Sequence, residues 1–202
     1  MTAQAMKQTL RQSIIAGRAA LAEELHLRLS REITARLLEL PPYCEARTVL
    51  GYMHFGAEFV SEPWLQQVLR DGKRLLLPKV NTAIGELDLY HVEDVAEQLA
   101  PGAYGIREPI PERCARLEQL QEIDFILLPG VAFGRDGARL GYGGGFYDKL
   151  LARTEHSPVL AAAAFAMQIV DGIPQEATDR KVEWLVTENE TIYCVAPDAR
   201  DT

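Results

Sequence analysis

The chain has 202 residues, 48% hydrophobic and 25% charged, with a formal net charge of −8. This length and balance predict a single globular domain over residues 1–202, and the acidic charge argues against nucleic-acid binding, which needs a basic surface. No apolar run reaches the ~18 residues of a membrane span, and Lys7, Arg11 and Arg18 interrupt any leader-like N-terminus, so we expect a cytoplasmic protein with no membrane contact.

Helical periodicity dominates residues 3–40. Apolar side chains recur at helical spacing at Met6, Leu10, Ile14, Leu21, Leu25, Leu29, Ile33 and Leu37. Gly17 or Ser30 is a candidate break between two helices, and Pro41-Pro42 is expected to end the stretch.

Segments of strand length then alternate with helices. We expect strands over residues 48–53, 74–80, 86–92, 125–128, 159–165, 182–186 and 191–195. Helices are expected over 63–70, with Ser61 as N-cap, and over 145–153. Near-continuous apolar strands separated by helices predict a three-layer α/β/α domain. We expect a mainly parallel, Rossmann-like sheet preceded by N-terminal helices.

Ligands of open α/β sheets bind beyond the carboxyl ends of the strands. This rule selects three segments, residues 53–58, 129–148 and 166–168. The second is the most informative, because it gathers many of the chain's 15 glycines. Its glycines fit neither the GxxxxGK[ST] nor the GxGxxG pattern, so it is neither a P-loop nor a dinucleotide fingerprint.

Glycines let backbone N–H groups approach an anion closely, and a helix that follows them adds the positive end of its dipole. Arg139 lies at the entry of the final glycine run and Lys149 just beyond it. The 129–148 segment is therefore either a phosphate-binding loop or a flexible glycine turn, and we favour the first.

Cysteines and histidines give no sign of a metal centre. The three cysteines have no CxxC spacing, and the four histidines form no HExxH pattern. We expect reduced thiols and no histidine-bound catalytic metal.

The string from Pro129 to Phe133, followed by Gly137-Ala-Arg-Leu-Gly-Tyr-Gly-Gly-Gly-Phe-Tyr-Asp148, closely resembles the signature of the 5-formyltetrahydrofolate cyclo-ligase family. Weaker pieces follow in the family's order: residues 7–11, Glu58, residues 104–109 and residues 179–187. The resemblance covers nearly the whole chain and implies an enzyme. That enzyme uses ATP and Mg²⁺ to convert 5-formyltetrahydrofolate to 5,10-methenyltetrahydrofolate.

The resemblance also implies roles for individual residues. Its ATP-binding positions are Lys7, Arg11, Arg139, Leu140, Gly141, Tyr142, Gly143, Gly144, Gly145, Phe146 and Tyr147. Its folate-binding positions are Met53, Glu58, Tyr142, Gly143, Gly144, Gly145 and Phe146. Arg139, Tyr147 and Asp148 are the implied catalytic residues, and Asp148 and Asp179 the implied magnesium ligands.

From the residues alone, several of these positions have a plainer interpretation. Lys7 and Arg11 form a solvated surface pair, Glu58 an exposed loop carboxylate, and Met53 a core residue at the end of a strand. Two other functions also remain open, namely a sugar-phosphate isomerase or CoA transferase on a similar sheet, and a non-catalytic folate- or RNA-binding module. ATP-dependent turnover separates them from a cyclo-ligase, which we expect to be monomeric and to have only small-molecule partners.

Overall fold

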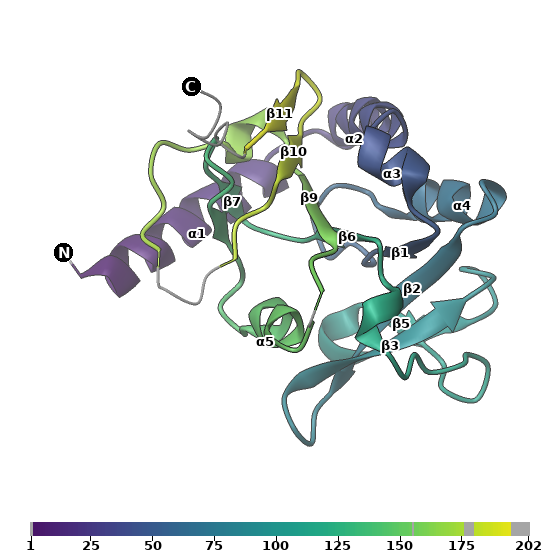
Figure 1. Ribbon diagram of the computed structural model, residues 1–202. Coiled ribbons are helices and arrows are strands. Elements are labelled where there is room, and N and C mark those ends of the chain that lie inside the picture. Colours follow the sequence, from purple (N-terminus) through teal and green to yellow (C-terminus); the bar gives the residue numbers. More distant parts are fainter. Residues whose placement is uncertain (1, 155, 176–179, 195–202) are drawn as a thin grey trace, which may run out of the picture.

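A seven-stranded sheet lies at the centre of the protein (Figure 1). The computed structural model describes residues 2–154, 156–175 and 180–194. The strand order is β11-β10-β9-β6-β1-β2-β3. The strands are β1 (Thr48–Leu50), β2 (Arg74–Asn81), β3 (Glu86–Val92), β6 (Phe125–Leu128), β9 (Val159–Ala163), β10 (Trp184–Val186) and β11 (Thr191–Tyr193).

The five inner strands are parallel, and only the edge strands β3 and β11 pair in the antiparallel sense. The mainly parallel sheet is therefore confirmed. All inner strands end at one edge of the sheet, so the segments that follow β1, β6, β9 and β10 meet there.

Apolar side chains point alternately to the two faces of the sheet and build two core layers. On β6, Phe125 and Leu127 join one cluster, while Ile126 and Leu128 join the other. The first layer contains side chains of α2 (Glu23–Leu38), α3 (Pro41–Glu45) and α4 (Glu62–Arg70). The second contains side chains of α5 (Phe146–Ala152). Helices thus cover both faces, which confirms the three-layer prediction.

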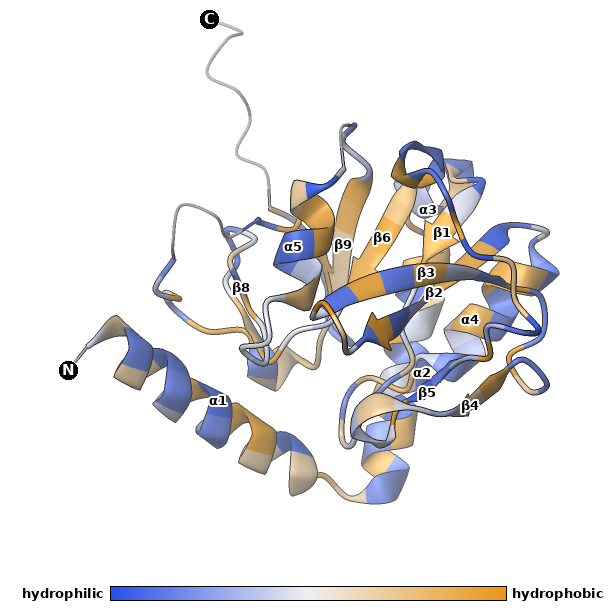
Figure 2. Ribbon diagram, turned by 90° about the horizontal axis from the view of Figure 1, so that it is seen from below, coloured by the Kyte–Doolittle hydropathy of each residue, from blue (hydrophilic) through white to orange (hydrophobic). Residues whose placement is uncertain are grey.

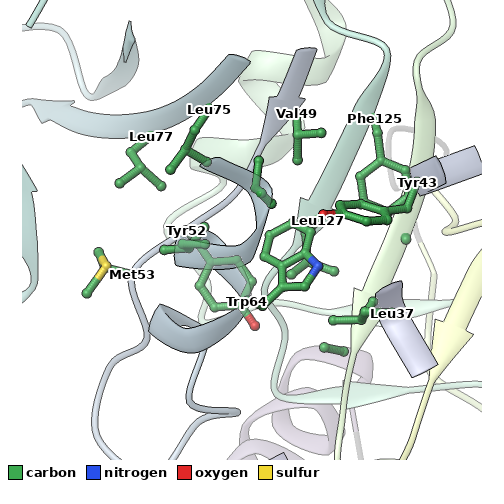
Figure 3. Packing of buried hydrophobic residues seen from close by; sticks show 14 of the residues in the cluster. Leu37, Tyr43, Val49, Tyr52, Met53, Trp64, Leu75, Leu77, Phe125 and Leu127 are labelled. Atoms are coloured by element: carbon green, nitrogen blue, oxygen red, sulfur yellow. The ribbon is translucent and has the colours of Figure 1, made fainter. Parts of the chain in front are cut away.

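Aromatic packing consolidates the first layer (Figure 3). The Trp64 ring lies 5.8 Å from the Tyr43 ring and 6.4 Å from the Phe125 ring, measured between centroids. Tyr52 and Met53, which follow β1, belong to the same layer. The core therefore holds the segment that leads away from β1 at the carboxyl edge.

The N-terminal helix α1 (Ala3–Ala19) has its own packing partner (Figure 2). Leu10 and Ile14 pack against a small apolar cluster. Its other members are four residues of the loop after β6 and one residue further along the chain: Val131, Ala132, Ala138, Leu140 and Ile173. Within that loop, β7 (Ala132–Phe133) and β8 (Arg139–Leu140) form a hairpin. One face of α1 is therefore fixed against the glycine-rich loop.

Several boundaries differ from the sequence prediction. The helical stretch breaks after Ala19, close to Gly17, and Ser30 lies inside α2. Pro41-Pro42 ends α2 but also begins α3, because proline suits a first helical turn. The strand at 48–53 ends early, at Leu50. Ser61 precedes α4 as predicted, yet its hydroxyl donates to the Tyr52 carbonyl rather than capping the helix.

Short elements were not predicted at all. These are the β4 (Leu99–Pro101) and β5 (Arg107–Pro109) hairpin, the β7–β8 hairpin, and the 3-10 turns η1 (Ala103–Gly105), η2 (Leu120–Glu122) and η3 (Ala166–Gln168). Within the described ranges, no helix is long and apolar enough to cross a membrane.

Candidate active site

The glycine-rich loop lies at the carboxyl edge of the sheet, as predicted, because it leaves β6 at Leu128 and leads into α5. Between β8 and α5 the chain depends on two glycines. Gly143 has a φ of 103° and Gly145 a φ of 67°, values that other residues rarely adopt. The glycines therefore set the path of the loop from the hairpin to the first turn of α5.

Cationic side chains of α1 face this loop. The Arg11 Nε donates a hydrogen bond to the Gly141 carbonyl oxygen at 2.8 Å. A Cβ atom at Gly143 would lie 3.8 Å from the Arg11 guanidinium group. Lys7, one turn earlier on the same helical face, is half-buried. Arg11 is thus part of the loop's surroundings rather than of a solvated surface pair.

A hydrogen bond joins the loop to the segment after β1. The Tyr142 hydroxyl donates to Glu58 Oε1 at 2.5 Å, across 84 positions of sequence. The Phe55 N–H donates to Glu58 Oε2 at 2.8 Å. Glu58 is only 4% exposed, so its interpretation as an exposed loop carboxylate is wrong. Two segments that the resemblance assigns to the site are therefore in contact.

Burial raises the pKa of Glu58 above its ordinary value. The hydrogen bonds from Tyr142 and Phe55, and the positive charge of Arg18, act in the opposite direction and favour the carboxylate. The ionisation of the buried Glu58 side chain therefore depends on Tyr142, Phe55 and Arg18.

Three tyrosines surround this carboxylate. Burial raises the pKa of Tyr52, Tyr142 and Tyr147, and the negative charge of Glu58 raises each of them further. Arg139 acts the other way on Tyr147. All three phenols therefore stay protonated at neutral pH and can donate hydrogen bonds.

Arg139 and Asp148 form an ion pair at the two ends of the glycine run, with Nη2 to Oδ1 at 2.5 Å. The Arg139 side chain is 5% exposed, and its Nη1 also donates to the Pro129 carbonyl oxygen at 3.3 Å. Its buried Nε has no hydrogen-bond partner within the described residues. A buried guanidinium group with an unused donor is a suitable ligand for an anion in the loop.

Other implied ligand residues have structural roles here. Met53 is buried in the first core layer beside Tyr52 (Figure 3), and Leu140 is buried beneath α1. Phe146 is half-buried and packs against the second core layer. Gly144 is exposed and lies beside the Phe146 ring. Their contacts with ligands stay predictions.

The magnesium assignment concerns one carboxylate inside the described residues and one outside them. Asp148 is half-buried in the first turn of α5, whereas Asp179 lies outside the described residues. The described ranges contain no group of three or more His, Cys, Asp or Glu placed to hold a metal ion. Mg²⁺ takes one or two carboxylates plus phosphate oxygens and water, and Asp148 is one carboxylate of that kind.

Arg18 is the residue that the sequence analysis missed. It is 4% exposed, and its Nη2 donates to the Tyr142 hydroxyl at 2.6 Å. Its position could have indicated this, because Arg18 follows Arg11 by seven residues and so continues the helical face of Lys7 and Arg11.

Two open hollows lie at the opposite edge of the sheet. One is lined by residues 44–47 and 71–74, before β1 and β2, and the other by residues that include Pro158 and Lys181, before β9 and β10. Neither is lined by a residue of the glycine-rich loop.

A three-layer α/β fold with an arginine-lined glycine loop at the carboxyl edge is typical of proteins that bind anionic ligands such as nucleotides there. Residues 3–188 match the 5-formyltetrahydrofolate cyclo-ligase family, and the chain belongs to it. It is therefore an ATP-dependent ligase that converts 5-formyltetrahydrofolate to 5,10-methenyltetrahydrofolate.

Individual relatives agree with this membership. The chain is 31% identical to the 5-formyltetrahydrofolate cyclo-ligase of Escherichia coli K12, over 84% of this chain and 93% of that one. It is 27% identical to a probable cyclo-ligase of Caenorhabditis elegans, over 93% and 95%. The solved 5,10-methenyltetrahydrofolate synthetase of Aquifex aeolicus superposes with a TM-score of 0.82 at 33% identity, covering 98% of this chain and all of that one.

Proposed function

We propose that this chain closes the folate ring through a phosphorylated formyl intermediate, with ATP on the α1 side of the glycine loop and folate at Glu58. The observation that carries this proposal is the hydrogen bond from Tyr142 to Glu58. It brings the loop expected to bind ATP into contact with the carboxylate expected to bind the pterin, as in-line transfer between two substrates requires.

The nucleotide is held by positive charge and backbone N–H groups. Arg11 contacts the loop from α1, Lys7 lies one turn earlier on the same helix, and Arg139 is held at β8. The segment from Leu140 to Tyr147 supplies the backbone donors. Charge-assisted hydrogen bonds of this kind are strong where water is partly excluded.

Glu58 recognises the pterin. A carboxylate accepts hydrogen bonds from an amino group and an adjacent ring N–H, the pattern that a pterin edge presents. Each carboxylate oxygen can accept two hydrogen bonds. Since Tyr142 and Phe55 use one site on each oxygen, Glu58 keeps capacity for the pterin. Met53 and the 142–146 segment complete this side of the site.

The reaction needs activation because a formamide is a poor electrophile and its oxygen a poor leaving group. The formyl oxygen attacks the γ-phosphorus of ATP, the bond to ADP breaks, and an O-phosphorylated formyl group forms on N5. N10 then attacks the formyl carbon and loses its proton, and the carbon–oxygen bond breaks. Phosphate departs with the former formyl oxygen, which leaves the methenyl bridge between N5 and N10.

The protein's part in these steps is positioning and charge stabilisation. Arg139 lies beside the loop, with a buried donor available to the transferring phosphoryl group. Tyr147, whose phenol stays protonated, would donate a hydrogen bond to the transferring group. Asp148, with Asp179, would hold Mg²⁺ on the ATP phosphates. That ion would shield phosphate charge during transfer.

Turnover with defined substrates tests this proposal. The protein is incubated with 5-formyltetrahydrofolate, ATP and Mg²⁺ while the near-ultraviolet absorbance of the methenyl product and the release of phosphate are followed. We expect one phosphate per methenyl product, and no product without ATP. Ring closure that proceeds without ATP would contradict the proposal.

The other expectations stay proposals. We propose a monomeric, cytoplasmic protein that binds only small molecules, and its net charge of −8 argues against nucleic acid as a partner. Size-exclusion chromatography with light scattering checks the first of these.

A further inference from the structure

Arg18 is a buried cation with few partners. The side chain is 4% exposed, yet its buried Nε has no hydrogen-bond partner within the described residues. Its Nη2 donates to the Tyr142 hydroxyl at 2.6 Å, and its guanidinium carbon lies 5.9 Å from the centroid of the Tyr142 ring. A buried charge is costly unless a nearby opposite charge compensates it.

That opposite charge is Glu58, reached through the Tyr142 hydroxyl. Arg18 donates to Tyr142, and Tyr142 donates to Glu58 Oε1 at 2.5 Å. Arginine has no acceptor and an ionised carboxylate has no donor, so the direction of both hydrogen bonds is fixed. The relay joins α1, the glycine-rich loop and the segment between β1 and α4.

We propose that Arg18 is a positioning residue for the folate, which fixes the Tyr142 hydroxyl against Glu58 and holds the Glu58 carboxylate in its charged form. The inference rests on the proposed role of Glu58 as the pterin ligand. It adds a determinant of folate binding on the same helix as the ATP-binding residues Lys7 and Arg11.

Other titratable groups around Glu58 do not supply this positive charge. The groups that face Glu58 are Tyr52, Tyr142, Tyr147, Arg18 and His26. The tyrosines are protonated and neutral. The His26 Nε2 lies 2.8 Å from the main-chain carbonyl oxygen of Glu58 and not from its carboxylate. Arg18 is therefore the permanent cation of this set, and burial otherwise favours the neutral acid.

Loss of Arg18 therefore has a distinct signature. Without its charge, Glu58 takes up a proton at a higher pH, and the protonated acid loses an acceptor that the pterin needs. Folate affinity then weakens about tenfold at neutral pH, the effect of one charge-assisted hydrogen bond. The acid limb of the affinity profile moves to higher pH, while ATP affinity stays near normal.

The experiment compares Arg18→Met, which keeps the length of the side chain, with Arg18→Lys, which keeps the charge. Arg28→Met is the matched control, because Arg28 is an exposed arginine of α2 paired with Glu32. The dissociation constant of 5-formyltetrahydrofolate is measured from pH 5 to pH 8 without ATP, and the ATP constant is measured separately. We expect the loss and the pH shift in Arg18→Met, partial recovery in Arg18→Lys, and neither effect in Arg28→Met.

Tyr142→Phe tests the same relay if Arg18→Met fails to fold, because it removes only the bridging hydroxyl. It should reproduce both the weaker folate binding and the pH shift. Wild-type protein that binds no 5-formyltetrahydrofolate would overturn both the proposed function and this inference. If the wild type binds folate and either Arg18→Met or Tyr142→Phe keeps normal folate affinity and a normal pH profile, the inference alone is overturned. Equal losses for folate and ATP without a pH shift, which a purely structural role predicts, would also overturn it.

Discussion

Arg139 and Asp148 form an ion pair across the glycine run, with the arginine almost fully buried and the aspartate about one-third exposed. The eight residues between these two positions contain the backbone expected to bind phosphate. The ion pair therefore holds the two ends of the glycine run together. It also places the Asp148 carboxylate beside the position expected for the triphosphate.

Asp148→Asn should lower stability, because it leaves the Arg139 guanidinium group buried without its counter-charge. The expected loss is about 1–3 kcal/mol in the free energy of unfolding, measured by urea denaturation. Asp136→Asn is the control, since Asp136 forms an exposed pair with Lys181 and should change stability by about 0.5 kcal/mol or less. Equal stability of Asp148→Asn and wild type would show that the pair does not hold the loop.

The two aspartates should act as one unit around magnesium. Asp148→Asn is expected to lower the rate on the order of a hundredfold, because the metal's stabilisation of phosphate charge is worth several kcal/mol. Asp179→Asn should show a similar or smaller loss and a higher magnesium requirement. The double variant should be little worse than the worse single variant. Initial rates against magnesium concentration check this, and losses that multiply at unchanged magnesium dependence would contradict a shared ion.

Alanine at Lys7 or Arg11 should weaken ATP binding more than folate binding. Each removes a charged donor from the loop, a loss of about ten- to a hundredfold in ATP affinity. Arg31→Ala, on the exposed face of α2, is the control for loss of a charge remote from the loop. The measurement is the apparent KM for each substrate. An unchanged apparent KM for ATP in both variants would show that Lys7 and Arg11 do not bind the nucleotide.

Glu58→Gln should weaken folate binding about ten- to a hundredfold and leave ATP binding near normal. The new amide donor would face the Tyr142 hydroxyl, the Phe55 N–H or the pterin's own N–H groups. Glu62→Gln is a matched control four residues away, because Glu62 pairs with Arg107 and has no assigned ligand. Isothermal titration with each substrate separates the effects, and unchanged folate affinity would remove Glu58 from the site.

The stability of the protein should also depend on the ionisation of Glu58. Burial raises the pKa of Glu58 in the folded state above the value of 4.5 expected for a free side chain. The folded state therefore holds this proton more tightly than the unfolded chain. The contribution of Glu58 to stability is greatest at acid pH and falls as pH rises through the raised pKa. The unfolding free energy of Glu58→Gln, relative to wild type, should rise between pH 4 and pH 7. A constant difference across that range would contradict a raised pKa.

Much of the fold follows from the sequence, because long apolar strands and helices have a clear period. The segments at 74–80 and 125–128 became β2 and β6 with bounds within one residue. The β7–β8 hairpin could not be predicted, since two-residue strands show no period. The antiparallel direction of β3 and β11 was likewise absent from the pattern, because alternation does not distinguish strand direction.

The parts of the site that lie in one short sequence segment could be predicted. The parts that tertiary packing brings together could not. The glycine run with Arg139 and Asp148 is visible in the sequence. The relay from Arg18 to Glu58 depends on α1 packing against the β7–β8 hairpin, which no local pattern reveals. The burial of Glu58 was missed for the same reason, since a lone carboxylate in a short loop is ordinarily solvated.

The most direct test of the account is the fate of the formyl oxygen. 5-Formyltetrahydrofolate labelled with oxygen-18 in the formyl group is converted with unlabelled ATP, and the released phosphate is analysed by mass spectrometry. Phosphorylation of that oxygen predicts that each phosphate carries one labelled oxygen atom. Unlabelled phosphate, released together with methenyl product, would contradict the phosphorylated intermediate and the arrangement of the two substrates derived from it.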